Sequence, residues 1–211
     1  MVTDTECDCN SGLRRLYRCS DCFMPNPVCK RCIVDEHARL PFHCIEEHNG
    51  KFFKACSLSS VGLSVNLMHD TKACPHSDDG VQTTVVHTNG VHSIRVKYCD
   101  CVGRPEKVVQ LTKQGLFPAT AKNPRTLFTF ELLKDFHLHT RVSKKSAYDY
   151  LRATYRKTAI SLLGDTSVSK LVYPWLKQAD LAKGAIPAVP SCFPNVEVVG
   201  SQSLERASII H

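Results

Sequence analysis

The stretch that decides the fold is residues 7–43, which read CDCNSGLRRLYRCSDCFMPNPVCKRCIVDEHARLPFH. Its cysteines and histidines form four close pairs, and these are Cys7 with Cys9, Cys19 with Cys22, Cys29 with Cys32, and His37 with His43. Zinc takes four sulfur or nitrogen ligands in a tetrahedron, and a C-x2-C turn directs two thiolates at one ion. The eight side chains therefore predict two zinc ions, each with a filled ligand set.

The same stretch holds few large apolar side chains, so burial alone cannot fold it. Structural zinc contributes on the order of 10 kcal/mol per site in small peptides, which offsets the chain entropy. Free thiols in an ordinary core are the alternative, but that core needs more apolar residues than lie between the ligands. We therefore expect residues 1–55 to fold as a double-zinc cluster that leaves no position for a catalytic water.

Cysteine usage and charge indicate where the chain acts. Eleven of the twelve cysteines precede residue 102, which separates a metal-rich half from a conventional half. The first ten residues carry three carboxylates and no apolar run, unlike a signal peptide. The sequence also has no stretch of about 18 apolar residues, so we expect no membrane contact. We expect an intracellular, reducing and nuclear location, where thiols stay available for metal. The net charge of +7 favours polyanionic partners such as DNA.

A strand and a hairpin follow the cluster. Residues 61–68 alternate between apolar and polar, as in a half-buried strand. Residues 83–87 and 91–98 are strand-like runs separated by Asn89-Gly90, a strong hairpin signal because both turn positions need a positive φ. The sequence therefore predicts a hairpin over residues 83–98.

The returning strand ends in a C-x-C motif, whose two thiols need two further ligands to complete a tetrahedron. The nearest candidates lie just beyond the previous strand, and His76 and His92 compete for the histidine position. The expected third zinc site, which staples the sheet within residues 56–103, consists of His69, Cys74, Cys99 and Cys101.

Three cysteines have no partner at knuckle spacing, and these are Cys44, Cys56 and Cys192. A cysteine without metal partners usually behaves as a small hydrophobic residue. We expect plain buried thiols at these positions.

Helical patterns dominate residues 104–184. A first helix is predicted over residues 105–113, with a proline in its first turn and Gly115 beyond its end. A second helix is predicted over residues 124–139, where the apolar residues form a broad stripe that is typical of a core-facing helix.

A third helix is predicted over residues 144–163, with Ser143 as its N-cap and Gly164 at its end. A last helix, over residues 167–183, is interrupted by a proline. Residues 185–211 have the composition of a disordered tail or of a truncated reading frame.

Basic side chains gather on the third predicted helix, where a single acidic residue, Asp149, accompanies them. A basic stripe of this kind can follow a phosphate backbone, although a solvated helix face has the same pattern. The candidate nucleic-acid contacts are Arg141, Lys144, Lys145, Arg152, Arg156 and Lys157.

The four pairs at the start of the chain resemble the RING and B-box families, in which alternate pairs share an ion. This resemblance implies one zinc site of Cys7, Cys9, Cys29 and Cys32, and a second of Cys19, Cys22, His37 and His43. A sequential arrangement remains open, because the first pair is tighter than a standard knuckle.

A wider resemblance covers roughly residues 7–155. The run from Cys19 to Phe53, with Cys74-Pro75, Asn89-Gly90 and the C-x-C motif, is similar to the cysteine cluster, second CxC-like subtype, at the front of KDZ transposases. The resemblance implies a zinc-binding, non-catalytic accessory module for DNA binding or targeting of a mobile element. It also implies an RNase-H-like transposase domain further along the polypeptide, and we expect that domain to be absent from this chain.

A protein-interaction module of the B-box or RING kind is the alternative function, because acidic residues around the second ligand pair disfavour DNA contact there. Its partners would be other transposase segments or other proteins. An enzyme is not expected, since the sequence has no glycine-rich phosphate loop, no H-E-x-x-H and no G-x-S-x-G. The predicted fold is α+β, with a small zinc-bound cross-brace cluster, a zinc-stapled β-hairpin sheet and a C-terminal helical segment.

Overall fold

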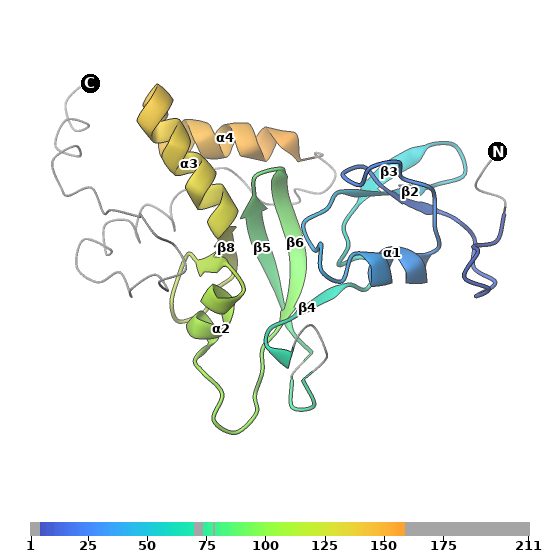
Figure 1. Cartoon of the computed structure of the whole chain (residues 1–211), viewed down its shortest axis with the longest axis horizontal. Coiled ribbons are helices and arrows are strands. Elements are labelled where there is room, and N and C mark those ends of the chain that lie inside the picture. Colours follow the sequence, from blue (N-terminus) through green and yellow to red (C-terminus); the bar gives the residue numbers. More distant parts are fainter. Residues whose placement is uncertain (1–4, 70–73, 78, 159–211) are drawn as a thin grey trace, which may run out of the picture.

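The computed structural model describes residues 5–69, 74–77 and 79–158, and in that part of the chain it contains two β-sheets and four helices. Figure 1 shows a small sheet on one side of the molecule and a larger sheet at its centre, with α2, α3 and α4 around the larger sheet. The predicted α+β class is confirmed. No helix in these ranges is long and apolar enough to cross a membrane. The predicted helix over residues 167–183, Gly164, the tail and Cys192 lie outside the described residues.

The small sheet has three antiparallel strands in the order β1 (Tyr17–Cys19), β2 (Ile45–His48) and β3 (Phe53–Cys56). Helix α1 (Lys30–Glu36) packs on it through Ile33, which is buried together with Ile45. The core of this part is small, and its remaining buried residues include Leu58, Val61 and Leu63 from the chain that leads to the larger sheet.

The larger sheet has the strand order β4 (Ser64–Asn66), β6 (Gly90–Lys97), β5 (Val81–His87), β8 (Thr126–Thr129) and β7 (Leu116–Pro118). The β5–β6 and β7–β8 pairs are antiparallel, whereas β4 runs parallel to β6 and β8 runs parallel to β5. Strand β4 is shorter than the strand predicted over residues 61–68.

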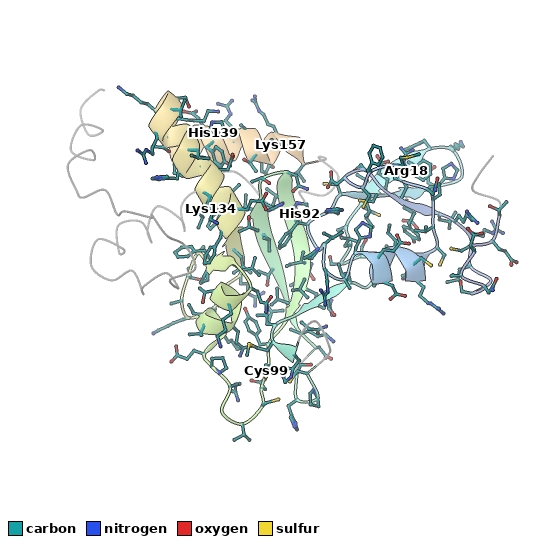
Figure 2. All side chains as sticks on the ribbon, in the orientation of Figure 1. Arg18, His92, Cys99, Lys134, His139 and Lys157 are labelled. Atoms are coloured by element: carbon teal, nitrogen blue, oxygen red, sulfur yellow. The ribbon has the colours of Figure 1, made fainter. Side chains whose placement is uncertain are left out.

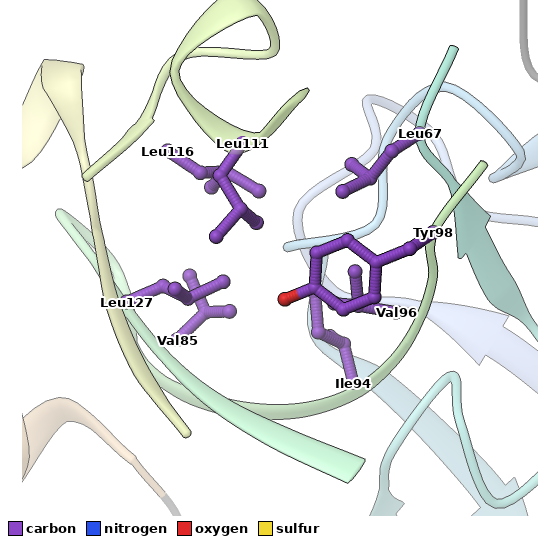
Figure 3. Close-up of a cluster of buried hydrophobic side chains, with 8 residues drawn as sticks. All are labelled: Leu67, Val85, Ile94, Val96, Tyr98, Leu111, Leu116 and Leu127. Atoms are coloured by element: carbon purple, nitrogen blue, oxygen red, sulfur yellow. The ribbon is translucent and has the colours of Figure 1, made fainter. Parts of the chain in front are cut away.

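Both faces of the larger sheet are covered, because successive residues of a strand point to opposite faces. Val85 and Leu127 face the cluster that includes Leu111 of α2 (Lys107–Lys113), and these side chains converge in Figure 3. Their neighbours Val86 and Phe128 face α3 (Phe130–Ser143) and α4 (Ala147–Lys157). All four of these strand residues are completely buried.

The hairpin over residues 83–98 is confirmed, but its turn lies one residue earlier than predicted. His87 pairs with Gly90, so Thr88 and Asn89 form the turn, and of the predicted Asn89-Gly90 pair only Gly90 has a positive φ, of 150°. The Asn89 side chain instead donates to Asp21 Oδ2 at 3.0 Å and to the carbonyl oxygen of Phe42 at 2.8 Å. The hairpin tip is therefore fixed by contacts with the small sheet region.

The helix predicted over residues 124–139 begins later in the structure. Residues 126–129 form strand β8, and Thr129 then caps α3 by accepting a hydrogen bond from the Leu132 amide at 3.2 Å. Pairing with β5 overrides the helical periodicity, since threonine and aromatic residues are favoured in strands. Of α3 itself only Leu132 is buried, whereas Leu138 and Val142 are exposed.

The helix predicted over residues 144–163 is also shifted. Helix α3 continues to Ser143, Lys144 adopts a left-handed conformation with φ of 49°, and Ser146 is the actual cap of α4. The described residues 104–158 therefore contain two strands as well as helices, and these strands belong to the same sheet as β4, β5 and β6.

The substitution Phe128→Ala should lower the free energy of unfolding by about 3–5 kcal/mol, because it opens a cavity between β8 and the helices. Leu138→Ala, at a position that is 62% exposed, should change it by less than about 0.5 kcal/mol. Urea unfolding of the zinc-loaded protein, followed by circular dichroism, measures both. Equal losses in the two variants would contradict the described core.

Candidate metal centres

Three groups of cysteine and histidine side chains have their ligand atoms within 4.8 Å of one another. The first group joins the start of the chain to the start of α1, where Cys29 is the N-cap residue. Its sulfur pairs Cys7–Cys32 and Cys9–Cys29 are 3.8 and 3.5 Å apart, and the Cys29 amide donates to Cys7 Sγ at 3.4 Å. The members of this group are Cys7, Cys9, Cys29 and Cys32.

The second group joins the end of β1 to the end of α1, where His37 is the C-cap residue. Cys22 Sγ lies 3.5 Å from His37 Nε2 and 3.4 Å from His43 Nδ1. His37 Nδ1 lies 2.8 Å from the Ile33 carbonyl oxygen, so Nδ1 carries the proton. The lone pair of Nε2 is then available to bind a metal ion. The members of this group are Cys19, Cys22, His37 and His43.

The two groups use alternate pairs along the chain, and α1 lies between them. This is the cross-brace arrangement that the RING and B-box resemblance implied, and the sequential alternative does not fit these distances. Local spacing allowed either pairing; the β1–β2 contact and the position of α1 select one.

The third group connects the ends of β4 and β6. His69 Nε2 lies 3.1 Å from Cys99 Sγ and 3.6 Å from Cys101 Sγ, and Cys74 Sγ lies 3.5 Å from Cys101 Sγ. His92 does not belong to it, because its Nε2 lies 2.8 Å from Asn89 Oδ1 on the hairpin. The members of this group are His69, Cys74, Cys99 and Cys101.

The donor sets fit zinc on geometric and chemical grounds. Sulfur atoms bound at about 2.3 Å around a tetrahedral ion lie about 3.8 Å apart, close to the observed separations. Thiolates and imidazoles suit zinc, whereas calcium and magnesium prefer oxygen ligands. Each group supplies four protein ligands, which is the composition of a structural site without an open position.

Among the ligand groups, the pKa values of Cys9 and His43 are shifted toward the protonation state that binds metal. The hydrogen bond from Ser11, whose hydroxyl lies 3.0 Å from Cys9 Sγ, lowers the pKa of the Cys9 thiol to about 6. Burial lowers the pKa of His43 and so favours its neutral imidazole. Sequence reasoning missed Ser11 and also Gln110, which contacts Cys99, since neither belongs to a recognised ligand spacing.

The remaining described cysteines, Cys44 and Cys56, lie outside the three groups. They are partly rather than fully buried, which corrects the prediction. Burial raises the pKa of each thiol to about 12, so both remain protonated and unreactive near neutral pH.

The predicted nucleic-acid contacts gather around α4 and the end of α3, at the top of the view in Figure 2. All are exposed except Lys145, which is half-buried. Lys157 is partly occupied, because its ammonium group donates to the Thr88 carbonyl oxygen at 2.7 Å. Arg141 thus lies in the last turn of α3, Lys144 and Lys145 in the connection to α4, and Arg152 and Arg156 on α4, with Lys157 hydrogen-bonded to the hairpin.

Residues 58–161 match the family model for the CxC2-like cysteine cluster associated with KDZ transposases. The resemblance inferred from the sequence is confirmed over this range, which contains the third metal group and lies beyond the first two. The matched family is an accessory cysteine cluster and not a catalytic domain. No curated protein and no solved structure gave a significant match to the chain.

Removal of the metal by a strong chelator should unfold the front of the chain first, because the core around Ile33 is small. We expect amide hydrogen exchange to lose protection over residues 7–57 and to keep it in β5, β6 and β8. Adding excess zinc back should restore protection. Unchanged protection in demonstrably metal-free protein would contradict a metal-supported fold.

Substitution of a single ligand should remove a single ion. Native mass spectrometry of Cys32→Ser should find one zinc ion fewer than in the unmodified chain, since the first group then has three ligands. Cys44→Ser, which changes a thiol outside the groups, is the matched control and should keep the full number of ions. An equal loss in both variants would contradict the assigned ligands.

Proposed function

We propose, starting from the match of residues 58–161 to the KDZ-associated cysteine cluster, that the chain is a zinc-bound, non-catalytic module of a transposase that binds DNA in the nucleus. In this proposal, the metal groups fix the scaffold and the exposed basic surface of α3 and α4 contacts the phosphate backbone. The observation that carries it is the placement of basic side chains on the face of α4 that points away from the core.

The two faces of α4 divide cleanly. Tyr150, Leu151 and Thr154 are buried against the larger sheet and α3. Arg152 and Arg156 are four residues apart, so they lie one above the other on the helix surface and are both exposed. Side chains aligned in this way can neutralise successive phosphates along one strand of DNA.

The basic face rests on a fixed support. The Tyr150 hydroxyl donates to the Asp135 carboxylate of α3, and Lys157 donates to the Thr88 carbonyl oxygen on the hairpin. The Thr158 hydroxyl accepts a hydrogen bond from the Val91 amide at 2.7 Å. These contacts hold both ends of α4, so DNA binding requires no ordering of this helix.

Direct DNA contact is not proposed for the metal groups themselves. The filled ligand sets supply structure and leave no ligand position for water or for phosphate. The small sheet also carries Glu47 on β2, whose carboxylate repels a phosphate backbone, while the Glu46 carboxylate is paired with Arg18 at 2.7 Å.

A protein-interaction surface is the second candidate, and a specific feature favours it. Phe23 and Met24 follow directly after the ligand Cys22 and are 94% and 76% exposed. Large apolar side chains held out in solvent are common at protein-binding sites. This candidate places the partner beside the second metal group, whereas the DNA proposal uses the exposed surface of α3 and α4.

The DNA proposal is tested by measuring the affinity of the zinc-loaded chain for random duplex DNA at several salt concentrations. The logarithm of the binding constant should fall steeply with the logarithm of the salt concentration, by about 0.9 per phosphate contact. The triple variant Lys145→Glu, Arg152→Glu, Arg156→Glu should bind far more weakly and reduce this slope by about 3.

The matched control is Lys51→Glu, Lys54→Glu, Lys122→Glu, which changes the net charge from +7 to +1 as the test variant does, since each substitution subtracts 2. These lysines are exposed, and none of them belongs to α3 or α4. Equal loss of binding in both variants would mean that net charge alone attracts DNA. Absence of DNA binding in the unmodified chain would favour the protein-interaction candidate, which Phe23→Ser then tests.

A further inference from the structure

We propose that Gln110 of α2 is a positioning residue for the third metal group, which it holds in a binding-competent geometry through the main chain of Cys99. This inference concerns the construction of the third group and goes beyond the proposed contact with DNA. It requires that the third group binds metal, which the experiment below tests separately.

Gln110 uses both ends of its side-chain amide on the segment that carries the ligands. Its Oε1 accepts a hydrogen bond from the Cys99 amide at 2.8 Å, and its Nε2 donates to the Cys99 carbonyl oxygen at 3.0 Å. The same Nε2 donates to the Pro105 carbonyl oxygen at 3.0 Å. One side chain thus fixes both polar main-chain groups of a ligand residue and closes the loop that follows it.

The position of Gln110 makes these contacts strong and specific. Gln110 is completely buried, although glutamine usually lies at the protein surface. Buried amide groups are costly unless they are hydrogen-bonded, so the Gln110 side chain and the Cys99 main chain satisfy each other. Substitution of Gln110 by an apolar residue leaves the Cys99 amide and carbonyl groups without these partners.

The contact connects the metal group to the rigid core. Strand β6 ends at Lys97, two residues before Cys99, so the ladder of the sheet does not hold the ligand. Gln110 lies beside Leu111, which is completely buried in the cluster of Figure 3. Helix α2 therefore connects the core to Cys99, whose Sγ lies 3.1 Å from His69 Nε2.

Residues that orient a metal ligand without touching the metal typically change metal affinity by about 10–100-fold. Gln110→Met keeps the length and volume of the side chain but removes all three hydrogen bonds. We expect it to weaken binding at the third group by about 10–100-fold and to leave the other two groups unchanged.

The experiment is a chelator competition on the full chain, in which zinc release is followed with a chromogenic chelator. Cys99→Ser removes a ligand of the third group and so identifies its component of the release curve. If Cys99→Ser does not change the bound metal, the third group is not a metal site, and the proposal for Gln110 fails with it. The DNA-binding test described above is unaffected by that outcome.

A purely structural role for Gln110 is distinguished by the neighbouring variant Leu111→Ala. This variant creates a cavity in the same helix and the same core without touching Cys99. After both variants are measured for unfolding free energy, Gln110→Met should show a weakening of the third site at least tenfold larger than Leu111→Ala. The positioning role would be overturned if the two variants weakened zinc binding at the third site equally for the same loss of unfolding free energy. It would also be overturned if Gln110→Met weakened zinc binding equally at all three sites.

A spectroscopic measurement adds a readout that stability alone does not move. Cobalt bound by three sulfur ligands and one nitrogen absorbs differently from cobalt in the other two donor sets. The bands that Cys99→Ser abolishes should shift or weaken in Gln110→Met and stay unchanged in Leu111→Ala.

If Gln110→Met does not fold, Gln110→Glu can replace it, because glutamate keeps the shape of the side chain and the acceptor for the Cys99 amide. The chain without substitution offers an independent test. In the zinc-loaded native chain, the Gln110 side-chain amide protons should exchange slowly, and removal of metal should accelerate them. Fast exchange in the zinc-loaded chain would overturn the proposal.

Discussion

The front of the molecule depends on the attachment of one short helix to two metal groups. Helix α1 has seven residues, well below the length of about 12–15 at which an isolated helix becomes stable in water. Cys29 and Cys32 at its start belong to the first group and His37 at its end belongs to the second. Its apolar contribution to the small core comes mainly from Ile33, so metal bound by these groups would provide the larger part of its support.

The second metal group lies where the small sheet region meets the β5–β6 hairpin. Asp21 lies between the ligands Cys19 and Cys22, and Phe42 precedes the ligand His43. Both accept hydrogen bonds from the Asn89 side chain at the hairpin tip. Cys19, Cys22 and His43 therefore flank both acceptors, so metal bound at this group would hold them in place for the Asn89 contact.

His92 completes this contact. Burial, together with the nearby His87, lowers the pKa of His92 to about 4, so the ring is neutral. The Asn89 amide nitrogen donates elsewhere and leaves Oδ1 as the acceptor, so His92 Nε2 carries the proton in their 2.8 Å hydrogen bond. The Asn89 side chain is therefore held by Asp21, by the Phe42 carbonyl oxygen and by His92, with Cys44 Sγ 3.8 Å from its amide nitrogen.

The ligand groups could be predicted from sequence, whereas the helix boundaries could not, and the reason is physical. Ligand spacing is a local property, since Cys19 and Cys22 must face one ion wherever the chain goes. Residues 126–129 have no such local determinant: their apolar pattern suits a helix, and only pairing with β5 makes them a strand. Gln110 is a further example, because its proposed role follows from the contact of α2 with Cys99, which lies eleven residues earlier in the preceding loop.

The family match begins inside the core that the small sheet region shares with the chain leading to the larger sheet. Residues 58–161 contain the larger sheet, the third metal group and both of the large apolar clusters except for Phe42, which packs on one of them. Yet Leu58, Val61 and Leu63, at the start of this range, are buried against Ile33 and Ile45 of the small sheet. The matched unit thus has its own core and its own metal group, whereas the front cluster borrows apolar surface from it. Loss of metal from the first two groups should consequently expose these three side chains before it disturbs the clusters on either face of the larger sheet.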